Sequence, residues 1–407
     1  MPGDLKTTSR PFDVAVAGHI CLDIIPEFPH SEAASLSDFL TPGKLLEMGR
    51  LTLSSGGPVS NTGIALHLFG HSVAFMARLG EDELGQWLID RLQKEGCADG
   101  VTIAPGEGTS YTNVIAPTGI DRIFLHYPGA NSSFTSRDVD FTLVEKCRIF
   151  HLGYPPLMRS LYINEGEELV RCFQLAKEAG ATTSLDMSLP DPAAEAGKVD
   201  WRRILEKLLP HVDIFLPSIE EACSMLDPES FWPRRRKAGG AAVVDEIAPS
   251  EYSRAAKAFL DMGCRMTSLK SGHRGFYFRT ASEKVLEDMG AAGPSSLSGW
   301  ADRELWAPAI NLEHIASATG SGDSAIAGFL AAFLRGYPLE RCLCLANMVG
   351  YFNLQRLDAL SGLKPWGEIL DFLDSGSYEI VDPRIDEEGW NYDSSRRIFL
   401  GPLDGSH

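Results

Sequence analysis

Hydrophobic and polar positions in the central part of the chain alternate between two patterns. Short apolar runs, typical of buried strands, are separated by longer segments in which apolar residues recur at helical spacing. The predicted strands are 149–152, 182–186, 214–216, 266–270 and 275–279, and the predicted helices are 165–179, 201–209, 219–226 and 250–262. Such alternation predicts an α/β protein with a mostly parallel sheet and helices on both of its faces.

The N-terminal part predicts one strand followed by an excursion from the sheet. Residues 12–25 form an apolar run that is broken at Gly18 and ends near Asp23. A carboxylate at the end of a strand lies where open α/β sheets place ligand contacts, although Asp23 taken alone is more typical of an exposed strand end. The mixed segment 26–53 predicts an excursion that returns as a strand near 49–53.

Two further strands are predicted to form a hairpin. Residues 109–116 and 122–127 flank the turn-forming segment 117–121, which contains Pro, Gly and Asp. Before them, residues 73–79 predict a strand, and the helix that begins after Gly80 carries acidic residues in its first turn, as the helix dipole favours.

A glycine-rich turn at 317–322 leads into Asp323 and then into a helix of almost purely apolar residues. Backbone N–H groups at such a helix start, together with the positive end of the helix dipole, form an anion site. A carboxylate inside an anion site needs a function beside the anion. If the anion is a phosphate, Asp323 is suited to take a proton from a hydroxyl that attacks it.

Two other interpretations fit this stretch when it is read alone. Gly320, Gly322 and Ala325 match the loose dinucleotide pattern G-x-G-x-x-A, but that motif normally opens the first βαβ unit, and an Asp in its turn would repel a pyrophosphate. Alternatively, Asp323 caps the helix, since Asp is a favoured N-cap residue.

A second pair of glycines, Gly56 and Gly57, precedes another predicted helix. Paired glycines allow a ligand or a second backbone to come close, and Asn61 in the first turn can hydrogen-bond a hydroxyl. His67 and His71 are four positions apart, but no third ligand lies nearby, so we do not expect a zinc site.

Composition narrows the class of protein. The chain has 407 residues, of which 44% are hydrophobic, enough for one large α/β core with a smaller appended element. Its 37 basic and 55 acidic residues give a formal net charge of -18, which argues against nucleic acid as a partner.

The apolar run 325–334 is too short to span a bilayer, and the N-terminus lacks the apolar core of a secretory signal. The eight cysteines form no C-x-x-C pair, which indicates reduced side chains and a cytoplasmic protein.

Three segments read as additions to the α/β core. Residues 228–249 contain four consecutive basic residues beside two glycines and predict a solvated loop. Residues 283–311 are rich in Gly, Ser and Pro and predict a long surface loop or hairpin, and residues 378–407 predict a polar tail.

Five motifs, in this order, resemble the PfkB (ribokinase-like) family of carbohydrate kinases. They are Gly56-Gly57 with Asn61, Gly129-Ala130-Asn131, Pro217-Ser218-Ile219-Glu220-Glu221, the segment from Lys270 to Gly275, and Thr319-Gly320-Ser321-Gly322-Asp323. The resemblance covers residues 12–375 and implies a ribokinase-like central sheet sandwiched by helices. It also implies a small β-sheet lid formed from about 25–55 and 109–127, which leaves 376–407 as a C-terminal extension.

For the reaction, the resemblance implies transfer of a phosphoryl group from ATP to a sugar hydroxyl with Mg²⁺. Asp323 matches the family's general base, and Gly320, Ser321 and Gly322 match its anion hole. Asp23, Gly57 and Asn61 match sugar contacts. The physical interpretation agrees, because phosphoryl transfer needs positioning and charge neutralisation more than covalent chemistry.

The resemblance also assigns the nucleotide and metal positions. Lys270, Gly272, Gly275, Thr319 and Asn347 match the nucleotide side, and Glu221 matches the acidic residue that helps to order Mg²⁺ through water. No Walker sequence and no set of protein-kinase motifs occurs in the chain.

The chain departs from the family pattern at several supporting positions. Ser317-Ala318 replaces the family's Asp-Thr, whose acid helps to hold a monovalent cation, and Ser218 replaces the Asn of its N-x-x-E motif. Cys21 replaces an Asn of the first-strand pattern, and the usual Asp-x-Asn turn reads Asp186-Met187-Ser188.

The sequence is compatible with three functions. The principal one is an ATP-dependent kinase of a sugar or sugar-like polyol. The alternatives are a nucleoside kinase of the same fold and a non-catalytic sugar or nucleotide sensor. We expect the lid to form a sheet separate from the main one, to close over the substrate, and to offer a face for a homodimer.

Overall fold

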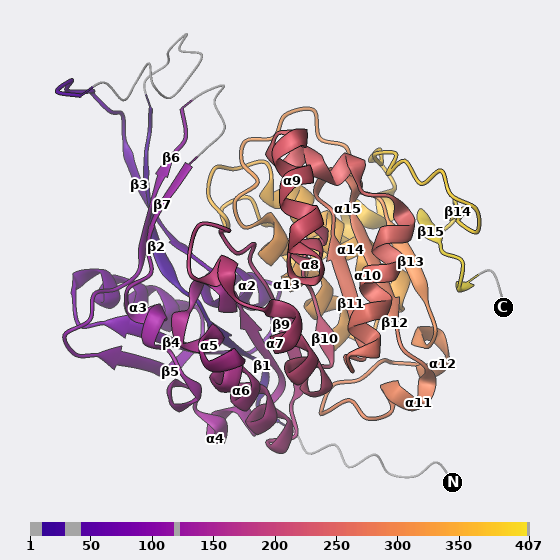
Figure 1. Ribbon diagram of the computed structural model, residues 1–407, viewed down its shortest axis with the longest axis horizontal. Coiled ribbons are helices and arrows are strands. Elements are labelled where there is room, and N and C mark those ends of the chain that lie inside the picture. Colours follow the sequence, from indigo (N-terminus) through magenta and orange to yellow (C-terminus); the bar gives the residue numbers. More distant parts are fainter. Residues whose placement is uncertain (1–9, 29–41, 118–122, 405–407) are drawn as a thin grey trace.

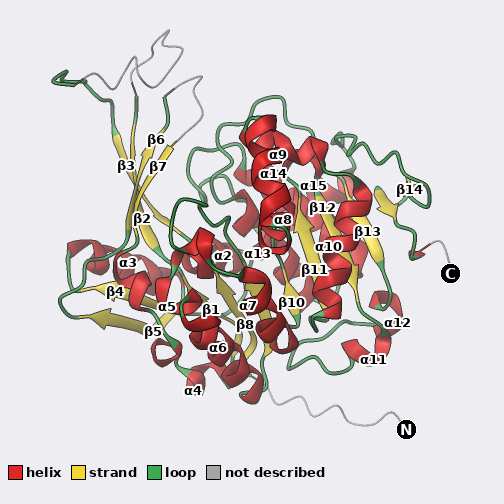
Figure 2. Ribbon diagram, viewed as in Figure 1, coloured by secondary structure: helices red, strands yellow, loops and turns green. Residues whose placement is uncertain are grey.

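The computed structural model describes residues 10–28, 42–117 and 123–404, which form two separate sheets with surrounding helices (Figures 1 and 2). The 11-stranded sheet has the order β14-β15-β13-β12-β11-β10-β9-β8-β1-β4-β5, and the 4-stranded sheet has the order β3-β2-β6-β7. The strands of the large sheet are β1 (Phe12–Gly18), β4 (Val73–Gly80), β5 (Cys97–Ala104), β8 (Cys147–Gly153), β9 (Thr182–Asp186), β10 (Ile214–Phe215), β11 (Met266–Lys270), β12 (Phe276–Thr280), β13 (Glu304–Ala307), β14 (Asn391–Asp393) and β15 (Ile398–Leu400).

Most of the large sheet is parallel, as the alternating pattern predicts. Every pairing from β5 to β11 is parallel, whereas β12, β13, β15 and β14 extend one edge as antiparallel strands. In a parallel array all carboxyl ends lie at one edge, so residues that follow β1, β8, β9 and β11 gather at the same edge of the sheet.

Helices cover both faces of the large sheet. The helices are α2 (Pro58–Leu68), α3 (Glu83–Glu95), α4 (Phe141–Val144), α5 (Arg159–Tyr162), α6 (Glu167–Glu178), α7 (Trp201–Leu208), α8 (Ile219–Leu226), α9 (Pro228–Ala238), α10 (Pro249–Asp261), α11 (Glu283–Leu286), α12 (Leu297–Trp300), α13 (Ser321–Leu334), α14 (Leu339–Asn353) and α15 (Trp366–Ser375). Alternate side chains of β1 enter different cores: Val14 and Val16 pack with α2, α13 and α14, while Ala15 and Ala17 pack on the side of α6, α7 and α10. Within the described residues, none of these helices is both long and apolar enough to cross a membrane.

The small sheet projects from the body at the upper left of Figure 1. It consists of β2 (Cys21–Pro26), β3 (Leu51–Gly56), β6 (Tyr111–Ile115) and β7 (Ile123–Tyr127). The prediction that the two lid segments form a sheet of their own is therefore confirmed. The predicted hairpin turn at 117–121 lies largely outside the described residues, as does the part of the 26–53 excursion at 29–41.

The prediction of one strand over 12–25 is wrong. After Gly18 the chain leaves the large sheet, and from Cys21 it forms β2 of the small sheet. Both strands are apolar, so periodicity cannot detect that the chain changes sheets between them.

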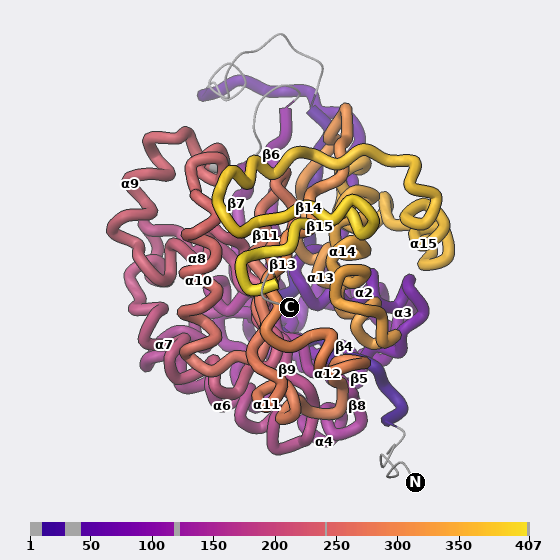
Figure 3. Tube along the Cα trace, turned by 90° about the vertical axis from the view of Figure 1, so that its right-hand side faces the viewer, coloured from indigo at the N-terminus to yellow at the C-terminus, as the bar shows by residue number. Residues whose placement is uncertain are grey.

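The three segments that read as additions are more structured than predicted. Residues 228–249 contain α9 and further helical turns, with Phe231 buried, instead of a solvated loop. Residues 283–311 contribute α11, α12 and β13, and place Trp300 and Trp306 in the core. Residues 378–407 contribute β14 and β15 to the edge of the large sheet (Figure 3). In each case a few large apolar side chains, spaced too widely to give a pattern, decide the structure.

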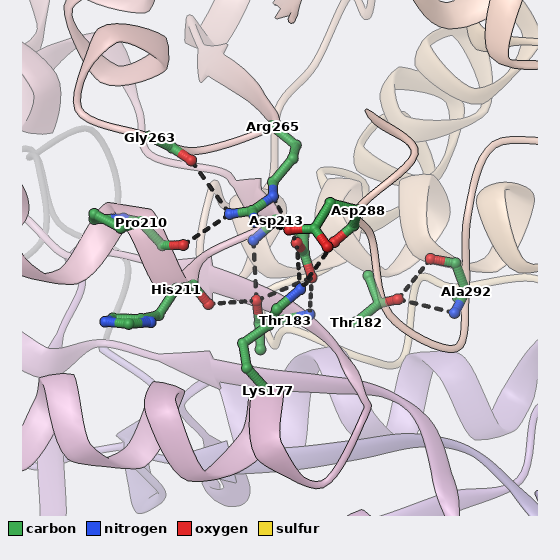
Figure 4. A network of polar contacts seen from close by, with 10 residues as sticks. All are labelled: Lys177, Thr182, Thr183, Pro210, His211, Asp213, Gly263, Arg265, Asp288 and Ala292. Carbon is green, nitrogen blue, oxygen red and sulfur yellow. Dashed lines mark hydrogen bonds and ion pairs between the residues drawn. The ribbon is translucent and has the colours of Figure 1, made fainter. Parts of the chain in front are cut away.

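A buried ion-pair network fixes the amino ends of the strands, at the edge opposite the carboxyl ends (Figure 4). Asp213 is completely buried before β10, where Lys177 Nζ and Arg265 Nε lie 2.9 Å and 3.2 Å from its Oδ1. Its Oδ2 accepts a hydrogen bond from the backbone N–H of Thr183 at 2.8 Å, which ties the start of β9 to β10. The network therefore joins α6, β9, β10 and β11 far from the edge that carries the candidate site.

Candidate active site

The candidate site lies where the carboxyl ends of the parallel strands meet the start of α13. Tyr154 follows β8, Asp186 ends β9, and Lys270 ends β11. All three interact with Asp323 in the first turn of α13 or with one another. This is the edge at which open α/β sheets bind ligands.

Asp323 does not cap α13. The N-cap residue is Gly320, with φ of 71° in the left-handed region, and no side chain accepts a hydrogen bond from the start of the helix. A Cβ at Gly320 would lie 2.4 Å from the Cβ of Ala359, so both the backbone conformation and the space demand glycine. The interpretation of Asp323 as a helix cap is therefore wrong, and its buried carboxylate needs another explanation.

The two oxygens of Asp323 have different environments. Oδ2 accepts hydrogen bonds from Asn61 Nδ2 at 2.8 Å and from the Tyr154 hydroxyl at 3.1 Å. Oδ1 is buried and has no hydrogen-bond partner in the described part of the chain. The carboxylate is thus held through one oxygen while the other is left for a further polar group, which is the arrangement that a general base requires.

The pKa of Asp323 is raised to about 7. Burial is the main cause, and the negative charge of Asp186 adds to it, while the Asn61 hydrogen bond, Lys270 and Tyr154 act in the opposite direction. A carboxylate with a pKa near neutrality is suited to accept and release a proton at physiological pH.

A buried lysine balances several carboxylates beside Asp323. Lys270 Nζ forms an ion pair with Asp186 and donates a hydrogen bond to the carbonyl of Leu216. Burial alone would lower the pKa of Lys270, but the carboxylates of Asp186 and Glu221 raise it, so the ammonium stays charged. Lys270 therefore supplies positive charge at the junction of β9, β11 and α13.

Glu221 belongs to a capping box at the start of α8. Its Oε2 accepts a hydrogen bond from the backbone N–H of Ser218 at 2.6 Å, and its own N–H donates to Ser218 Oγ at 3.1 Å. Burial raises the pKa of Glu221 to about 7. Among the described residues, no group of three or more His, Cys, Asp or Glu side chains is arranged to hold a metal ion.

One N–H group of the predicted anion hole, that of Ser321, is engaged in a turn. The N–H of Ser321 donates to the carbonyl of Ala318 at 3.3 Å, and the first bond of the helix runs from Ser324 N to Gly320 O at 2.8 Å. The N–H groups of Gly322 and Asp323 precede that bond and have no acceptor among the backbone bonds of the described chain. These two N–H groups are the donors best placed to receive an anion.

A cavity of about 410 Å³ opens beside this turn. It brings together most of the residues predicted for the nucleotide: Lys270, Gly272, Gly275 and Asn347, together with Ser321 and Gly322. Thr319 is not part of the lining. Its backbone N–H is already engaged, because it donates a hydrogen bond to Ser317 Oγ at 3.1 Å. Asn347 uses its Nδ2 to donate to the carbonyls of Ala307 and Pro308 at 2.8 Å and 2.9 Å, so it supports the cavity wall.

None of the three residues predicted to contact the sugar belongs to the lining of this cavity. Asp23, on β2 of the lid, is 8% exposed, and burial raises its pKa to about 6. Gly57 is the N-cap of α2 with φ of 84°, and a Cβ there would lie 2.6 Å from His19 Nδ1. Asn61 holds Asp323 through Nδ2, while its Oδ1 is buried without a partner in the described residues.

Four residues of this region were not among the predicted site residues, although Asp186 was named as part of an altered Asp-x-Asn turn. Tyr154 and Asp186 were detectable in principle, because both stand at the carboxyl end of a predicted strand. His19 and His126 gave no signal, since they are 107 residues apart. Their Nε2 atoms lie 3.4 Å apart, and His126 Nδ1 lies 3.0 Å from Thr112 Oγ1, so the pair joins the lid to the main body. Burial lowers the pKa of both imidazoles, which indicates that both are neutral.

Comparison with known proteins identifies one family over most of the chain. The model of the pfkB family carbohydrate kinases matches residues 13–365. An uncharacterized sugar kinase of Archaeoglobus fulgidus is 24% identical over 301 residues, which span 74% of this chain and 98% of the relative. A fructokinase of Solanum tuberosum is 28% identical over 182 residues, which span 43% of this chain and 51% of the fructokinase.

Solved structures show the same fold. The ribokinase of Thermotoga maritima superposes with a TM-score of 0.63 at 17% identity, covering 89% of this chain and 99% of that one. The ribokinase of Arabidopsis thaliana, in complex with ribose and ATP, gives a TM-score of 0.64 at 18% identity, covering 89% and 98%. A nucleoside kinase of Methanocaldococcus jannaschii gives 0.60 at 16% identity, covering 89% and 98%.

Proposed function

Because the chain belongs to the pfkB family of carbohydrate kinases, we propose that it transfers the γ-phosphoryl group of ATP to a hydroxyl of a sugar or sugar-like polyol, with Asp323 as the general base. One observation carries this proposal. Asp323 is buried at the start of α13 with Oδ2 held by Asn61 and Tyr154 and with Oδ1 unpartnered among the described residues. Next to it stand the N–H groups that are suited to a phosphate.

The proposed chemistry follows from these contacts. The acceptor hydroxyl donates its proton to Asp323 Oδ1 as its oxygen forms a bond to the γ-phosphorus, and the bond to the β-phosphate oxygen breaks to release ADP. The N–H groups of Gly322 and Asp323 stabilise the charge on the transferring group. Asn61 and Tyr154 keep the carboxylate oriented, so Asp323 does not have to reorient before it accepts the proton.

The residues of the site suit Mg²⁺ if the ion binds together with ATP, because the phosphates then supply further ligands. Mg²⁺ keeps several waters and takes one or two carboxylates together with substrate phosphates, which agrees with the absence of a three-ligand cluster among the described residues. Glu221 and Asp186 are the carboxylates that would hold it, through water. When bound, the ion neutralises charge on the phosphates. A protein from Escherichia coli with the same fold, at a TM-score of 0.65 and 19% identity, has a structure in complex with ATP and Mg²⁺, which supports this assignment.

The inner face of the lid is suited to cover the acceptor. In the register of the small sheet, Asp23 stands opposite Thr112, and Thr112 stands opposite His126. Directly paired residues share a face, so these three polar side chains point the same way. With Asn61 and Tyr154 below them, they offer hydrogen bonds and an aromatic surface to an uncharged polyol.

The outer face of the lid is apolar, and we propose that it pairs with a second copy of the chain. The residues on this face include Leu51, Leu53, Ile123, Leu125 and Tyr127, and each is between 42% and 54% exposed. Exposed apolar side chains collected on one sheet face favour association.

We also propose that the protein is cytoplasmic, which the eight unpaired cysteines support.

A panel of sugars, polyols and nucleosides, tested for ADP release with ATP and Mg²⁺, examines the proposed function. We expect turnover on a sugar or polyol, and a kcat about 10²–10⁴-fold lower in the Asp323→Asn protein. Turnover on nucleosides alone would assign the nucleoside kinase instead. If no compound is phosphorylated although binding is measurable by calorimetry, the protein is a sensor and the proposal is wrong.

A further inference from the structure

The C-terminal segment 378–384 lies against the cavity that the proposed function assigns to ATP. Residues 379–381 pair with 309–311: Asn311 N donates to Glu379 O at 2.9 Å, and Val381 N donates to Ala309 O at 2.8 Å. Ile310 and Ile380 form an antiparallel bridge between them. Residues 309–311 line the cavity, so this pairing brings Val381 to its edge, where its side chain becomes part of the lining.

Arg274 anchors this segment to the loop on the nucleotide side. The loop 270–275 lines the cavity, but the side chain of Arg274 points away from solvent and is only 3% exposed. Its Nε donates to the carbonyl of Pro383 at 2.9 Å. Its Nη1 donates to the carbonyls of Val244 and Ile247 at 3.0 Å and 2.7 Å, which also ties down the segment after α9.

The guanidinium of Arg274 is held by aromatic rings as well as by carbonyls. Its central carbon lies 5.3 Å from the ring centre of Tyr252 and 4.9 Å from that of Trp306. Trp306 in turn donates from Nε1 to the carbonyl of Arg274 at 2.7 Å. A buried arginine with this many partners fixes the relative positions of the loop, the C-terminal segment and the sheet.

The rest of the C-terminal region holds the segment from its far end. Beyond it, the chain returns as β14 and β15 beside β13, and Figure 3 shows its path from α15 across the molecule. Trp390 packs against Trp306 with ring centres 6.0 Å apart, and Asp404 Oδ2 accepts a hydrogen bond from Glu304 N at 2.7 Å. Segment 378–384 is therefore a fixed wall and not a loose tail.

The lining of the cavity combines polar and aliphatic groups. Ser321, Gly322 and Lys270 belong to or adjoin the anion site, whereas Ile310, Leu354 and Val381 supply aliphatic lining. A nucleoside has a flat base that packs well between aliphatic side chains, while its phosphates need N–H donors and positive charge. We propose that Val381 packs against the nucleoside of the phosphoryl donor, and that segment 378–384 thereby determines donor affinity. The inference rests on the proposed function, because it takes the ligand of this cavity to be ATP.

Substitution of Val381 tests the inference on the full-length protein. Val381 is partly exposed, so neither Val381→Ala nor Val381→Asp removes a core residue. We expect Val381→Ala to raise the Kd for ADP about 3- to 10-fold, since it removes two methyl groups from the contact. Val381→Asp also sets a carboxylate near a polyphosphate, so we expect it to raise the Kd about 10-fold or more. Calorimetric titration with ADP and Mg²⁺ measures both.

Controls separate this inference from the proposed function. Val285→Asp makes the same change on α11, at a residue that is 40% exposed and outside the cavity, and should leave the Kd for ADP unchanged. The KM for the acceptor should stay unchanged in both Val381 variants. If Val381→Asp binds ADP as tightly as the unaltered protein, the inference is wrong and the proposed function stands. If the unaltered protein binds no ADP, both are wrong.

Discussion

At the scale of single residues, Asp323 combines two features that are each unusual. Its carboxylate is almost completely buried without a full set of partners, and it stands at a helix start without capping the helix. An isolated buried charge is costly, so such a group is normally protonated or paired. The pKa of Asp323 is raised to about 7, so the protonated and the ionised carboxyl are both accessible near neutral pH. This intermediate state is what a proton acceptor needs.

Replacement of Asp323 by Asn removes the proton acceptor and keeps the shape. We expect kcat to fall by about 10²–10⁴-fold, the usual contribution of a general base. ADP affinity should hold or increase, because a negative charge near the phosphates is lost. The folded-state pKa of about 7 lies above the ordinary value of 3.8, so above pH 7 the fold holds a carboxylate that burial disfavours. The melting temperature at pH 8 should therefore be unchanged or higher in the variant.

Steady-state kinetics, calorimetry and thermal unfolding check these outcomes together. Near-normal turnover in Asp323→Asn would rule out its role as base. Unfolding of the variant would show instead that the residue is structural.

The hydroxyl of Tyr154 should set the pH at which Asp323 works. The reaction needs ionised Asp323, so kcat/KM for the acceptor should fall with decreasing pH below about 7. The Tyr154 hydrogen bond lowers the pKa of Asp323, and Tyr154→Phe removes it while keeping the ring. We therefore expect the acid limb of the profile to move to higher pH, and kcat/KM near pH 6.5 to fall about 10-fold, as for loss of a hydrogen bond to a charged group.

A full pH profile of kcat/KM measures both changes. Tyr162→Phe removes a tyrosine hydroxyl on α5, away from Asp323, and should leave the profile in place. An unshifted acid limb in Tyr154→Phe would contradict the positioning role of Tyr154.

At the scale of elements, the large sheet divides stability and function between its two edges. The carboxyl ends of the strands carry Asp323, whose Oδ1 has no hydrogen-bond partner in the described chain, whereas the amino ends carry the ion-pair network around Asp213 (Figure 4). The two edges should therefore respond differently to substitution.

Asp213→Asn tests this division. The change leaves Lys177 and Arg265 without their shared carboxylate, so we expect a loss of apparent stability of about 3–5 kcal/mol, as for breaking a buried ion pair. Asp261→Asn is the matched control: Asp261 pairs with Lys257 at 2.6 Å, but on an exposed face of α10. Exposed pairs contribute at most about 1 kcal/mol, so the control should be nearly neutral.

Stability is measured by urea unfolding followed by circular dichroism. The kcat is measured at a temperature at which both variants are folded. Asp213→Asn should keep its kcat. A large fall in kcat with unchanged stability would show that the network acts on catalysis.

At the scale of the whole molecule, the lid connects the acceptor site to the outer surface. Its inner face carries Asp23, Thr112 and His126, and its outer face carries the exposed apolar residues. Under the proposed function, one sheet would contact the substrate with one face and a second copy of the chain with the other. A second copy packed on the outer face would bury its exposed apolar side chains and so stabilise the lid over the site.

The dimer is tested by light scattering coupled to size exclusion. We expect the unaltered protein to elute as a dimer and Leu125→Lys, on the outer face of the lid, to shift it toward monomer. Val285→Lys places the same charge at a valine that is 40% exposed on α11, at the opposite end of the molecule from the lid (Figure 1), and should leave the dimer intact. A monomer for the unaltered protein at its highest soluble concentration would contradict the dimer.

The amino-acid sequence by itself determined the features that depend on neighbours along the chain. Apolar periodicity located β9, β11 and α8 with their observed bounds, and the alternation of strands and helices led to the parallel sheet. The turn at Gly320 and the position of Asp323 at the start of α13 were also readable, because the residues that build a helix start lie within a few positions of one another.

Only the tertiary structure decided what depends on residues far apart in the chain. The contact of His19 with His126 spans 107 residues, that of Arg274 with Pro383 spans 109, and that of Asn61 with Asp323 spans 262. The division of residues 12–25 between two sheets and the incorporation of residues 391–400 into the large sheet are of the same kind. Periodicity records which side of an element is buried but not which partner buries it. The partner is fixed only when the whole chain has packed, and at this site the partners set the orientation and the pKa of Asp323.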